Sequence, residues 1–167
     1  MAEAVLLRGD ANGLQAFLTL GQFLEKEGWA PEQVEDTPIY RMQFYGESGP
    51  VTCYAQVRTE EQILLCYAVA PVQAPPESRQ AVAEFVTRAN YGLWVGNFEM
   101  DWTDGEVRYK SSLDFEGLTL TPTLIRNVIS PTLQMLVCYL PGLINVIGGQ
   151  SPAEVLAKVT LDCGCGA

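Results

Sequence analysis

The stretch EMDWTDGEVRYK, residues 99–110, carries the strongest structural signal in the chain. Asp104 and Gly105 stand between two runs of alternating side chains. An Asp-Gly pair favours a tight β-hairpin, because glycine adopts a positive φ without strain and aspartate tolerates one. A two-residue loop would fix the register and leave one apolar face and one charged face. The predicted pairs are Thr103 with Glu106, Trp102 with Val107, Asp101 with Arg108, Met100 with Tyr109 and Glu99 with Lys110.

Three β-like runs precede this hairpin, at residues 39–45, 51–58 and 63–70. The second run alternates between the two faces of a strand, as a half-buried strand does. The third run is apolar on both faces, which suits an inner strand that is covered on both sides. Together with the two hairpin strands, these runs predict a five-stranded antiparallel sheet.

Helical spacing of apolar side chains predicts helices around these strands. The first helix covers residues 14–24, with Asn12 available as its N-cap and Gly28 at its end. The second helix follows the Pro-Pro pair at residues 75–76 and stops near Gly92. The chain is therefore expected to be an α+β protein with the element order α-β-β-β-α-β-β-α.

The last third of the chain contains several helix signals. Thr121, followed by proline, is a typical cap and helix start. Pro131 then interrupts this helix or opens a new one. A final segment opens at Ser151, again before proline, with Glu154 placed to complete a capping box.

Residues 133–147 are almost wholly apolar and are broken only by the Pro-Gly pair at residues 141–142. A membrane-spanning helix needs about 20 consecutive apolar residues, which is more than this stretch offers. We therefore favour a helix that is buried against the sheet or against a second subunit. Core, interface and lipid-facing positions all remain open for this segment.

Composition fits one domain. The chain has 167 residues, of which 48% are hydrophobic and 18% are charged, so it can form a single core without a partner. We place one domain at residues 1–162 and a flexible Cys-Gly tail at residues 163–167. The first ten residues lack the basic start and long apolar run of a secretory signal, which predicts a cytoplasmic location.

Charge and residue usage exclude several functions. The formal net charge of -10 opposes binding to nucleic acid and to anionic membrane surfaces. The chain has no histidine, which removes Ser-His-Asp, Cys-His and His-metal mechanisms. No glycine-rich phosphate-binding pattern occurs. We expect a protein that is not an enzyme, with no catalytic residue, no cofactor and no metal site.

Acidic residues cluster around the hairpin and could suggest acid-base catalysis or a metal site with oxygen ligands. The hairpin explains most of them more simply, as partners of basic residues or as turn residues. Their spacing matches no EF-hand loop. The residues concerned are Glu99, Asp101, Asp104, Glu106, Asp114 and Glu116.

The cysteines are odd in number and do not form the paired framework of a small secreted domain, so most are read as reduced thiols. Cys163 and Cys165 lie one residue apart near the end of the chain and could exchange disulfides or bind a soft metal. They supply only two of the four ligands of a closed zinc site. We favour a frayed tail and keep this possible thiol site as an alternative. The other cysteines are Cys53, Cys66 and Cys138.

Three sequence motifs resemble the YbjN family: NYGLWVGNFEMD at residues 90–101, YLPGL at residues 139–143 and SPA at residues 151–153. The resemblance extends over roughly residues 14–156. The family contains bacterial proteins described as sensory transduction regulators, with many cyanobacterial members. The element order also resembles the type III secretion chaperone-like fold.

This resemblance implies a non-catalytic protein-binding module, chaperone-like or regulatory, that acts as a homodimer and binds an unknown client or regulatory protein. In chaperones of this fold the second helix often forms the dimer contact. Here it would place Val82, Phe85 and Val86 in the interface, unless this stripe packs on its own sheet. The alternatives are a small thiol redox or metal-binding protein that uses Cys163 and Cys165, and a peripheral membrane protein.

Overall fold

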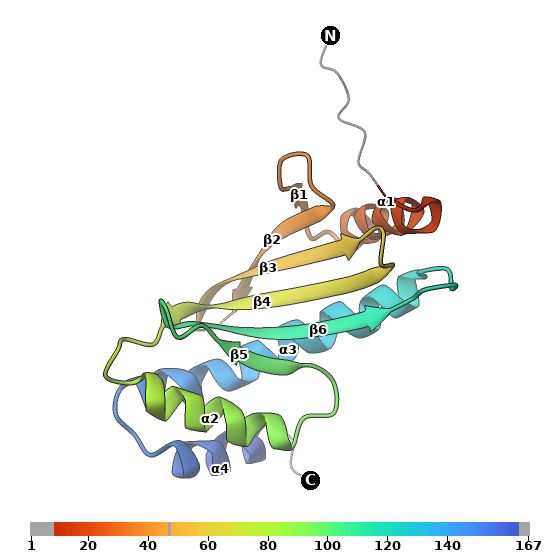
Figure 1. Cartoon of the computed structure of the whole chain (residues 1–167). Coiled ribbons are helices and arrows are strands. Elements are labelled where there is room, and N and C mark those ends of the chain that lie inside the picture. The colour runs from red at the N-terminus through yellow and green to blue at the C-terminus, as the bar shows by residue number, and fades with distance from the viewer. Residues whose placement is uncertain (1–8, 47, 164–167) are drawn as a thin grey trace.

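The computed structural model describes residues 9–46 and 48–163, which form four helices and one six-stranded antiparallel sheet (Figure 1). The strands lie in the order β1-β2-β3-β4-β6-β5. The α+β class and the antiparallel sheet are thereby confirmed. The elements are α1 (Ala11–Lys26), β1 (Glu32–Gln33), β2 (Ile39–Gly46), β3 (Gly49–Arg58), β4 (Ile63–Gln73), α2 (Arg79–Tyr91), β5 (Asn97–Met100), β6 (Glu106–Asp114), α3 (Pro122–Ile147) and α4 (Pro152–Asp162).

The predicted count of five strands and the predicted element order are wrong in two details. The sheet has a sixth strand, β1, in which Glu32 lies opposite Arg41 and Gln33 opposite Tyr40. Both residues of β1 are polar and exposed, so they lack the apolar alternation by which a strand is recognised. At the other end of the chain, two helices, α3 and α4, follow the sheet in place of one.

The hairpin of β5 and β6 is present, but its register differs by two residues from the predicted one. Glu99 lies opposite Arg108 and Met100 lies opposite Val107, so the predicted pairing of Asp101 with Arg108 is wrong. A shift of two residues keeps the side chains of the two strands on their predicted faces, because strand side chains alternate with a period of two. The acidic and basic side chains therefore still share one face. The predicted pairing of Trp102 with Val107 is wrong, since Trp102 lies in the loop and is 60% exposed.

The longer hairpin loop, residues 101–105, has a local cause. The Asp101 carboxylate accepts a hydrogen bond from the Thr103 amide at 2.7 Å, which bends the chain before the Asp-Gly pair. The Gly105 amide then donates to the Asp101 carbonyl at 2.8 Å. Gly105 has a φ of +81°, and its carbonyl accepts from the Ala74 amide at 2.8 Å. These bonds close a five-residue loop in place of the predicted two-residue loop.

The N-cap of helix α1 lies two residues earlier than predicted. This N-cap is Asp10, whose side chain accepts a hydrogen bond from the Asn12 amide at 2.8 Å. The assignment of Asn12 as the N-cap is therefore wrong, because Asn12 already lies in the first turn. Gly28 follows the end of the helix with a φ of +76°, as predicted for a glycine that terminates a helix.

Helix α3 is one continuous helix of 26 residues that includes Pro131 and Pro141. The predicted interruption at Pro131 is wrong, whereas the expected helix at residues 133–147 is present and continues through Pro141. A proline inside a helix costs about 3 kcal/mol, but α3 offsets this cost by burying side chains along its whole length. Thr121 caps the helix as predicted, accepting from the Leu124 amide at 3.3 Å. The buried residues of α3 are Ile125, Val128, Ile129, Thr132, Leu133, Leu136, Tyr139, Leu140, Gly142, Leu143 and Val146.

The length and composition of α3 would also suit a membrane span. Its most apolar window has a mean hydropathy of 1.3, yet half of that window is buried inside the fold. The segment at residues 133–147, which was expected to lie in the core, in an interface or against lipid, is thus part of a helix that packs in the core of the fold.

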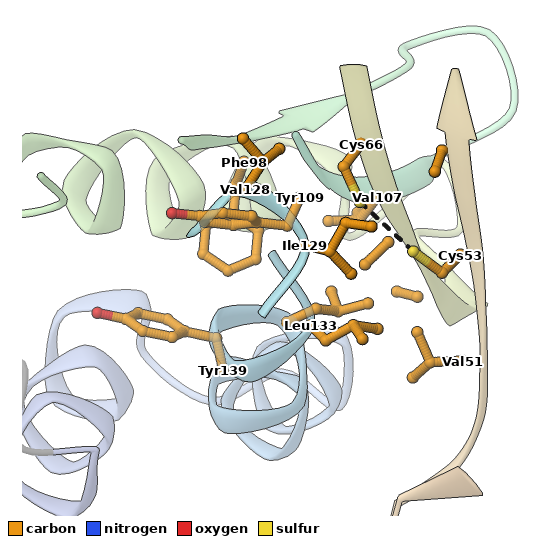
Figure 2. Packing of buried hydrophobic residues seen from close by; sticks show 14 of the residues in the cluster. Val51, Cys53, Cys66, Phe98, Val107, Tyr109, Val128, Ile129, Leu133 and Tyr139 are labelled. Atoms are coloured by element: carbon orange, nitrogen blue, oxygen red, sulfur yellow. Dashed lines mark hydrogen bonds between the residues drawn. The ribbon is translucent and has the colours of Figure 1, made fainter. Parts of the chain in front are cut away.

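The core lies between α3 and one face of the sheet. Figure 2 shows Ile129 and Leu133 of α3 pointing toward Cys53 and Cys66 on the strands. Farther along α3, the Tyr139 ring lies 5.2 Å from the Phe98 ring between their centroids. Buried side chains of all four helices and of β2 to β6 join in one cluster.

Helices α2 and α4 form a further layer beside α3. The Phe85 ring of α2 lies 6.3 Å from the Tyr139 ring of α3 between centroids. Helix α4 begins after Ser151, as predicted, but the Ser151 side chain makes no capping hydrogen bond, so the expected capping box with Glu154 is not formed. The backbone bond from the Val155 amide to the Ser151 carbonyl, at 3.0 Å, starts the helix instead.

Candidate functional site

One face of the sheet carries no helix in the described part of the chain. Buried side chains of β3 and β4 alternate with half-buried ones, and the buried set faces α3, which passes behind the sheet in Figure 1. Helix α1 lies on the same side, since its Phe17 ring stacks at 4.7 Å on Tyr40, which shares the face of the buried Ala55. We call the opposite side the open face, formed by Ile39, Arg41, Thr52, Tyr54, Gln56, Leu65, Tyr67, Val69, Arg108 and Lys110.

A row of two cations and two tyrosines crosses the middle of the open face. Arg41 of β2 lies opposite Tyr54 of β3, Tyr54 lies opposite Tyr67 of β4, and Tyr67 lies opposite Lys110 of β6. Arg108 adds a third cation, whose guanidinium carbon stands 4.5 Å from the centre of the Tyr67 ring. This distance is typical of a cation–π contact, which holds the Tyr67 ring and the Arg108 side chain together.

Glu99 of the edge strand β5 fixes two of these cations. Its carboxylate accepts a hydrogen bond from Arg108 at 2.9 Å and a second one from Lys110. Partial burial of Glu99 disfavours its charged form, but the hydrogen bonds from Lys110 and Arg108 outweigh this effect and lower its pKa. Arg41 is similarly paired, at 2.6 Å, with Glu32. Each cation of the open face thus has a carboxylate partner.

The open face contains two adjoining hollows. Both contain Glu106 and Arg108, so they meet at these two side chains. The first, of about 290 Å³, is lined by Ile39, Tyr54, Gln56, Tyr67, Val69, Glu106 and Arg108. The second, of about 370 Å³, is lined by Glu99, Met100, Asp101, Trp102, Glu106 and Arg108.

The acidic residues of the hairpin have structural roles. Asp101 and Asp104 accept hydrogen bonds from the backbone amides of Thr103 and Glu106 inside the loop. The bond from the Thr103 amide is the main reason why the pKa of Asp101 is lowered. Among the residues that the structure describes, no three His, Cys, Asp or Glu side chains come together in a way that could hold a metal ion. Asp101 and Asp104 thus act as turn residues, and Glu99 acts as an ion-pair partner.

The cysteines fall into two environments. Cys138 of α3 is joined by a disulfide to Cys163 at the end of α4, so these two cysteines are not reduced thiols and Cys163 is tied to α3. Cys53 and Cys66 are free, with both side chains fully buried and their sulfur atoms 3.5 Å apart. The hydrogen bond between Cys53 and Cys66, together with burial, raises the pKa of Cys53 well above its ordinary value. Cys165, the other predicted thiol, lies outside the described residues.

The predicted dimer contact on α2 lies inside the chain. Val82, Phe85 and Val86 are exposed by only 0%, 1% and 7%. Phe85 contacts Tyr139 of α3, and the whole helix packs against α3, α4 and β5. These three side chains have no surface to offer to a second folded chain, so the alternative in which the stripe packs within its own chain describes them.

The sequence contained one usable sign of the open face. The alternation in residues 51–58 placed Thr52, Tyr54 and Gln56 together on one side of a strand. The sequence did not show which strands are neighbours in the sheet. In the structure, β6 lies between β4 and β5. The row that ends at Lys110 depends on that arrangement.

These features define an α+β protein with a one-sided sheet, whose uncovered surface is rich in tyrosine and paired cations. The chain belongs to the YbjN family: the family model, described as "Putative bacterial sensory transduction regulator", matches residues 19–144. No curated protein matches the sequence. The matched range begins within α1 and ends within α3, so it includes the complete sheet and its open face.

Proposed function

We propose that this protein is a non-catalytic regulatory module of the cytoplasm that acts as a homodimer, and that two copies meet through their open faces. The observation that carries this proposal is the uncovered sheet face with Tyr54 and Tyr67 at its centre. The description of the family as a regulator supports a regulatory role in place of an enzymatic one.

The charge of the open face favours a second copy as its partner. Two chains of charge -10 repel each other over most of their surfaces. On the open face and in its two hollows, three cations lie near the four carboxylates of Glu32, Glu99, Asp101 and Glu106, so three positive and four negative charges leave a net charge of only -1. Two copies therefore meet least repulsion where these faces approach. Opposite charges on one surface also let each copy complement the other about a two-fold axis.

The composition of the open face is that of an interface centre. Tyrosine and arginine are the residue types, with tryptophan, that contribute most to protein–protein binding energy. Tyr54 and Tyr67 occupy the middle, and the half-buried apolar side chains of Ile39, Leu65 and Val69 surround them. Packing such a surface against its copy would remove apolar and aromatic area from water.

Light scattering on the wild type and two variants tests the dimer. Wild type at tens of micromolar is expected to show twice the 18.3 kDa mass of one chain. Tyr67→Asp removes the aromatic ring from the centre of the proposed interface and adds one carboxylate there on each copy, so it is expected to give the monomer mass. Leu18→Asp, which replaces a 56% exposed leucine on α1, is the matched control and should stay dimeric. A monomeric wild type, or a Tyr67→Asp protein that remains dimeric, would refute the proposal.

We also propose that the dimer binds a client or regulatory protein, as the chaperone-like resemblance implies. The end of α2 and the loop that follows it support this, because Tyr91, the last residue of α2, and Trp94 in the loop are 97% and 95% exposed. Exposed tyrosine and tryptophan close together in sequence are typical anchors for an apolar pocket on another protein. The expected result is a partner that is captured by wild type and by Leu118→Ala, a 62% exposed control, but is lost from Trp94→Ala.

A further inference from the structure

Helix α4 is held at its far end by a covalent bond. The Cys138–Cys163 disulfide joins α3 to the residue that follows α4, with the two Cα atoms 6.0 Å apart and the two cysteines 25 positions apart in sequence. Both cysteines are only half-buried, whereas Cys53 and Cys66 are fully enclosed. A reductant in solution therefore reaches the disulfide and not the free thiols.

Helix α4 packs on the rest of the fold through a small contact surface. Val155 and Val159, one helical turn apart, are its buried side chains among those described, with exposures of 3% and 7%. Both pack over Gly142 of α3, where an added Cβ atom would lie 2.6 Å from Val159 and 3.1 Å from Val155. The same Cβ atom would lie 3.1 Å from the Phe85 ring of α2. We call this surface of Gly142 and Phe85 the α2–α3 groove.

Without its covalent tether, α4 has little to hold it. The helix has 11 residues, and isolated helices shorter than about 12 to 15 residues are marginal in water. Two buried valines and the half-buried Leu156 are a modest anchor beside the many buried side chains of α3. The disulfide, by fixing the end of α4, keeps these valines close to their groove and lowers the entropy that α4 gains on leaving it.

We propose that the Cys138–Cys163 disulfide is a redox latch, and that its reduction frees α4 from the α2–α3 groove and exposes Phe85 and Gly142. In the oxidised protein the occupant of this groove is α4 itself. The latch lies on the helical side of the sheet, away from the open face, so it does not depend on how two copies associate.

The reaction that opens the latch is thiol–disulfide exchange with a dithiol. A thiolate of the dithiol attacks one sulfur of the disulfide, forms a mixed disulfide and releases the other sulfur as a thiolate, which takes up a proton. The second thiol of the dithiol then closes on the first and releases the remaining cysteine. The dithiol is oxidised by two electrons, and Cys138 and Cys163 become thiols. In reducing compartments, disulfides are usually transient and redox-sensing, which fits a latch that opens and closes.

Hydrogen exchange with mass spectrometry on the oxidised and the dithiothreitol-reduced full chain tests this inference, with the redox state of each sample read from its mass. Reduction is expected to speed the exchange of the amides of α4 by about tenfold or more, while α1 and β3 stay unchanged. Cys138→Ser is expected to match the reduced protein without any reductant. Cys165→Ser, which leaves the latch intact, is the matched control and should behave as wild type.

Three results would overturn the latch. The first is exchange in α4 that does not change after complete reduction. The second is a rise of equal size in α1, β3 and α4, which would make the disulfide a general stabiliser of the fold. The third is an oxidised sample in which Cys138 and Cys163 are both still free thiols. A change in dimer mass alone would not bear on the latch, so failure of the latch and failure of the dimer are separate outcomes.

Discussion

Tyr54 and Tyr67 lie directly opposite each other in the middle of the open face, and the Arg108 guanidinium stands over the ring of Tyr67. Adjacent strands place such opposed side chains about 5 Å apart, close enough to restrain each other. The cation–π contact and the ion pair of Arg108 with Glu99 restrain the ring further. The centre of the open face is therefore ordered before a partner arrives, which lowers the entropic cost of binding.

Gly105→Ala is expected to destabilise the protein by about 3 kcal/mol or more. Gly105 has a φ of +81°, and a Cβ atom there would lie 2.0 Å from the Ala74 carbonyl oxygen. The strained backbone and the collision with main chain act together. Urea denaturation measures the effect. Gly117→Ala, with a φ of +73° and open space around it, is the control and should cost only about 1 to 2 kcal/mol. Equal losses in the two variants would show that the contact with Ala74 is unimportant.

Stability is expected to fall on acidification through Glu99. The pKa of Glu99 is lowered in the folded protein relative to its ordinary value of 4.5. The contribution of Glu99 to the free energy of unfolding is therefore fully present above about pH 4.5 and is lost as the pH falls through the lower pKa of the folded state. Between about pH 5 and pH 3 the free energy of unfolding should decrease less steeply in Glu99→Gln than in wild type. Denaturant titrations across this range provide the measurement. Parallel profiles of the two proteins would contradict the assignment.

Helix α3 is expected to behave as a core helix. Leu136 is fully buried, so Leu136→Ala should lower the free energy of unfolding by about 2 to 5 kcal/mol. Ile144 on the same helix is 40% exposed, and Ile144→Ala should cost less than about 1 kcal/mol. Thermal or urea unfolding distinguishes the two.

A vesicle experiment addresses the membrane alternative for the same helix. Because half of its most apolar window is already buried against the fold, the protein should stay in the aqueous fraction when it is floated with lipid vesicles. Flotation of folded wild type, together with equal stability of Leu136→Ala and Ile144→Ala, would mean that α3 faces lipid.

The hairpin shows how far the sequence leads. Alternation along residues 99–110 correctly predicted which side chains share a face, because that property depends only on the period of a strand. The register depended on the loop, where the Asp101 side chain bends the chain three residues before the expected turn. A side-chain hydrogen bond to the backbone thus outweighed the preference of Asp104-Gly105 for a two-residue loop.

Helix α3 illustrates a different limit. A proline is a local signal to stop a helix, and an interruption was predicted at Pro131 on that ground. The helix continues through Pro131 and Pro141 because its buried face packs against the sheet along its whole length, and that burial is a property of the folded chain.

The candidate site shows both limits together. Tyr54 was placed on the correct side of its strand, but its partner row required the strand order, in which β6 lies beside β4. The apolar stripe of Phe85 on α2 suited both an interface and a core. Only the position of α4, whose Val159 packs over Gly142 beside Phe85, distinguishes between them.

The most direct test of the central claim is hydroxyl-radical footprinting of the tyrosines across a dilution series of the native protein. If two copies meet through their open faces, modification of Tyr54 and Tyr67, relative to the 97% exposed Tyr91, should fall as the concentration rises through the range in which the mass doubles. A ratio that stays constant while the mass doubles would show that the dimer forms elsewhere and would contradict the account.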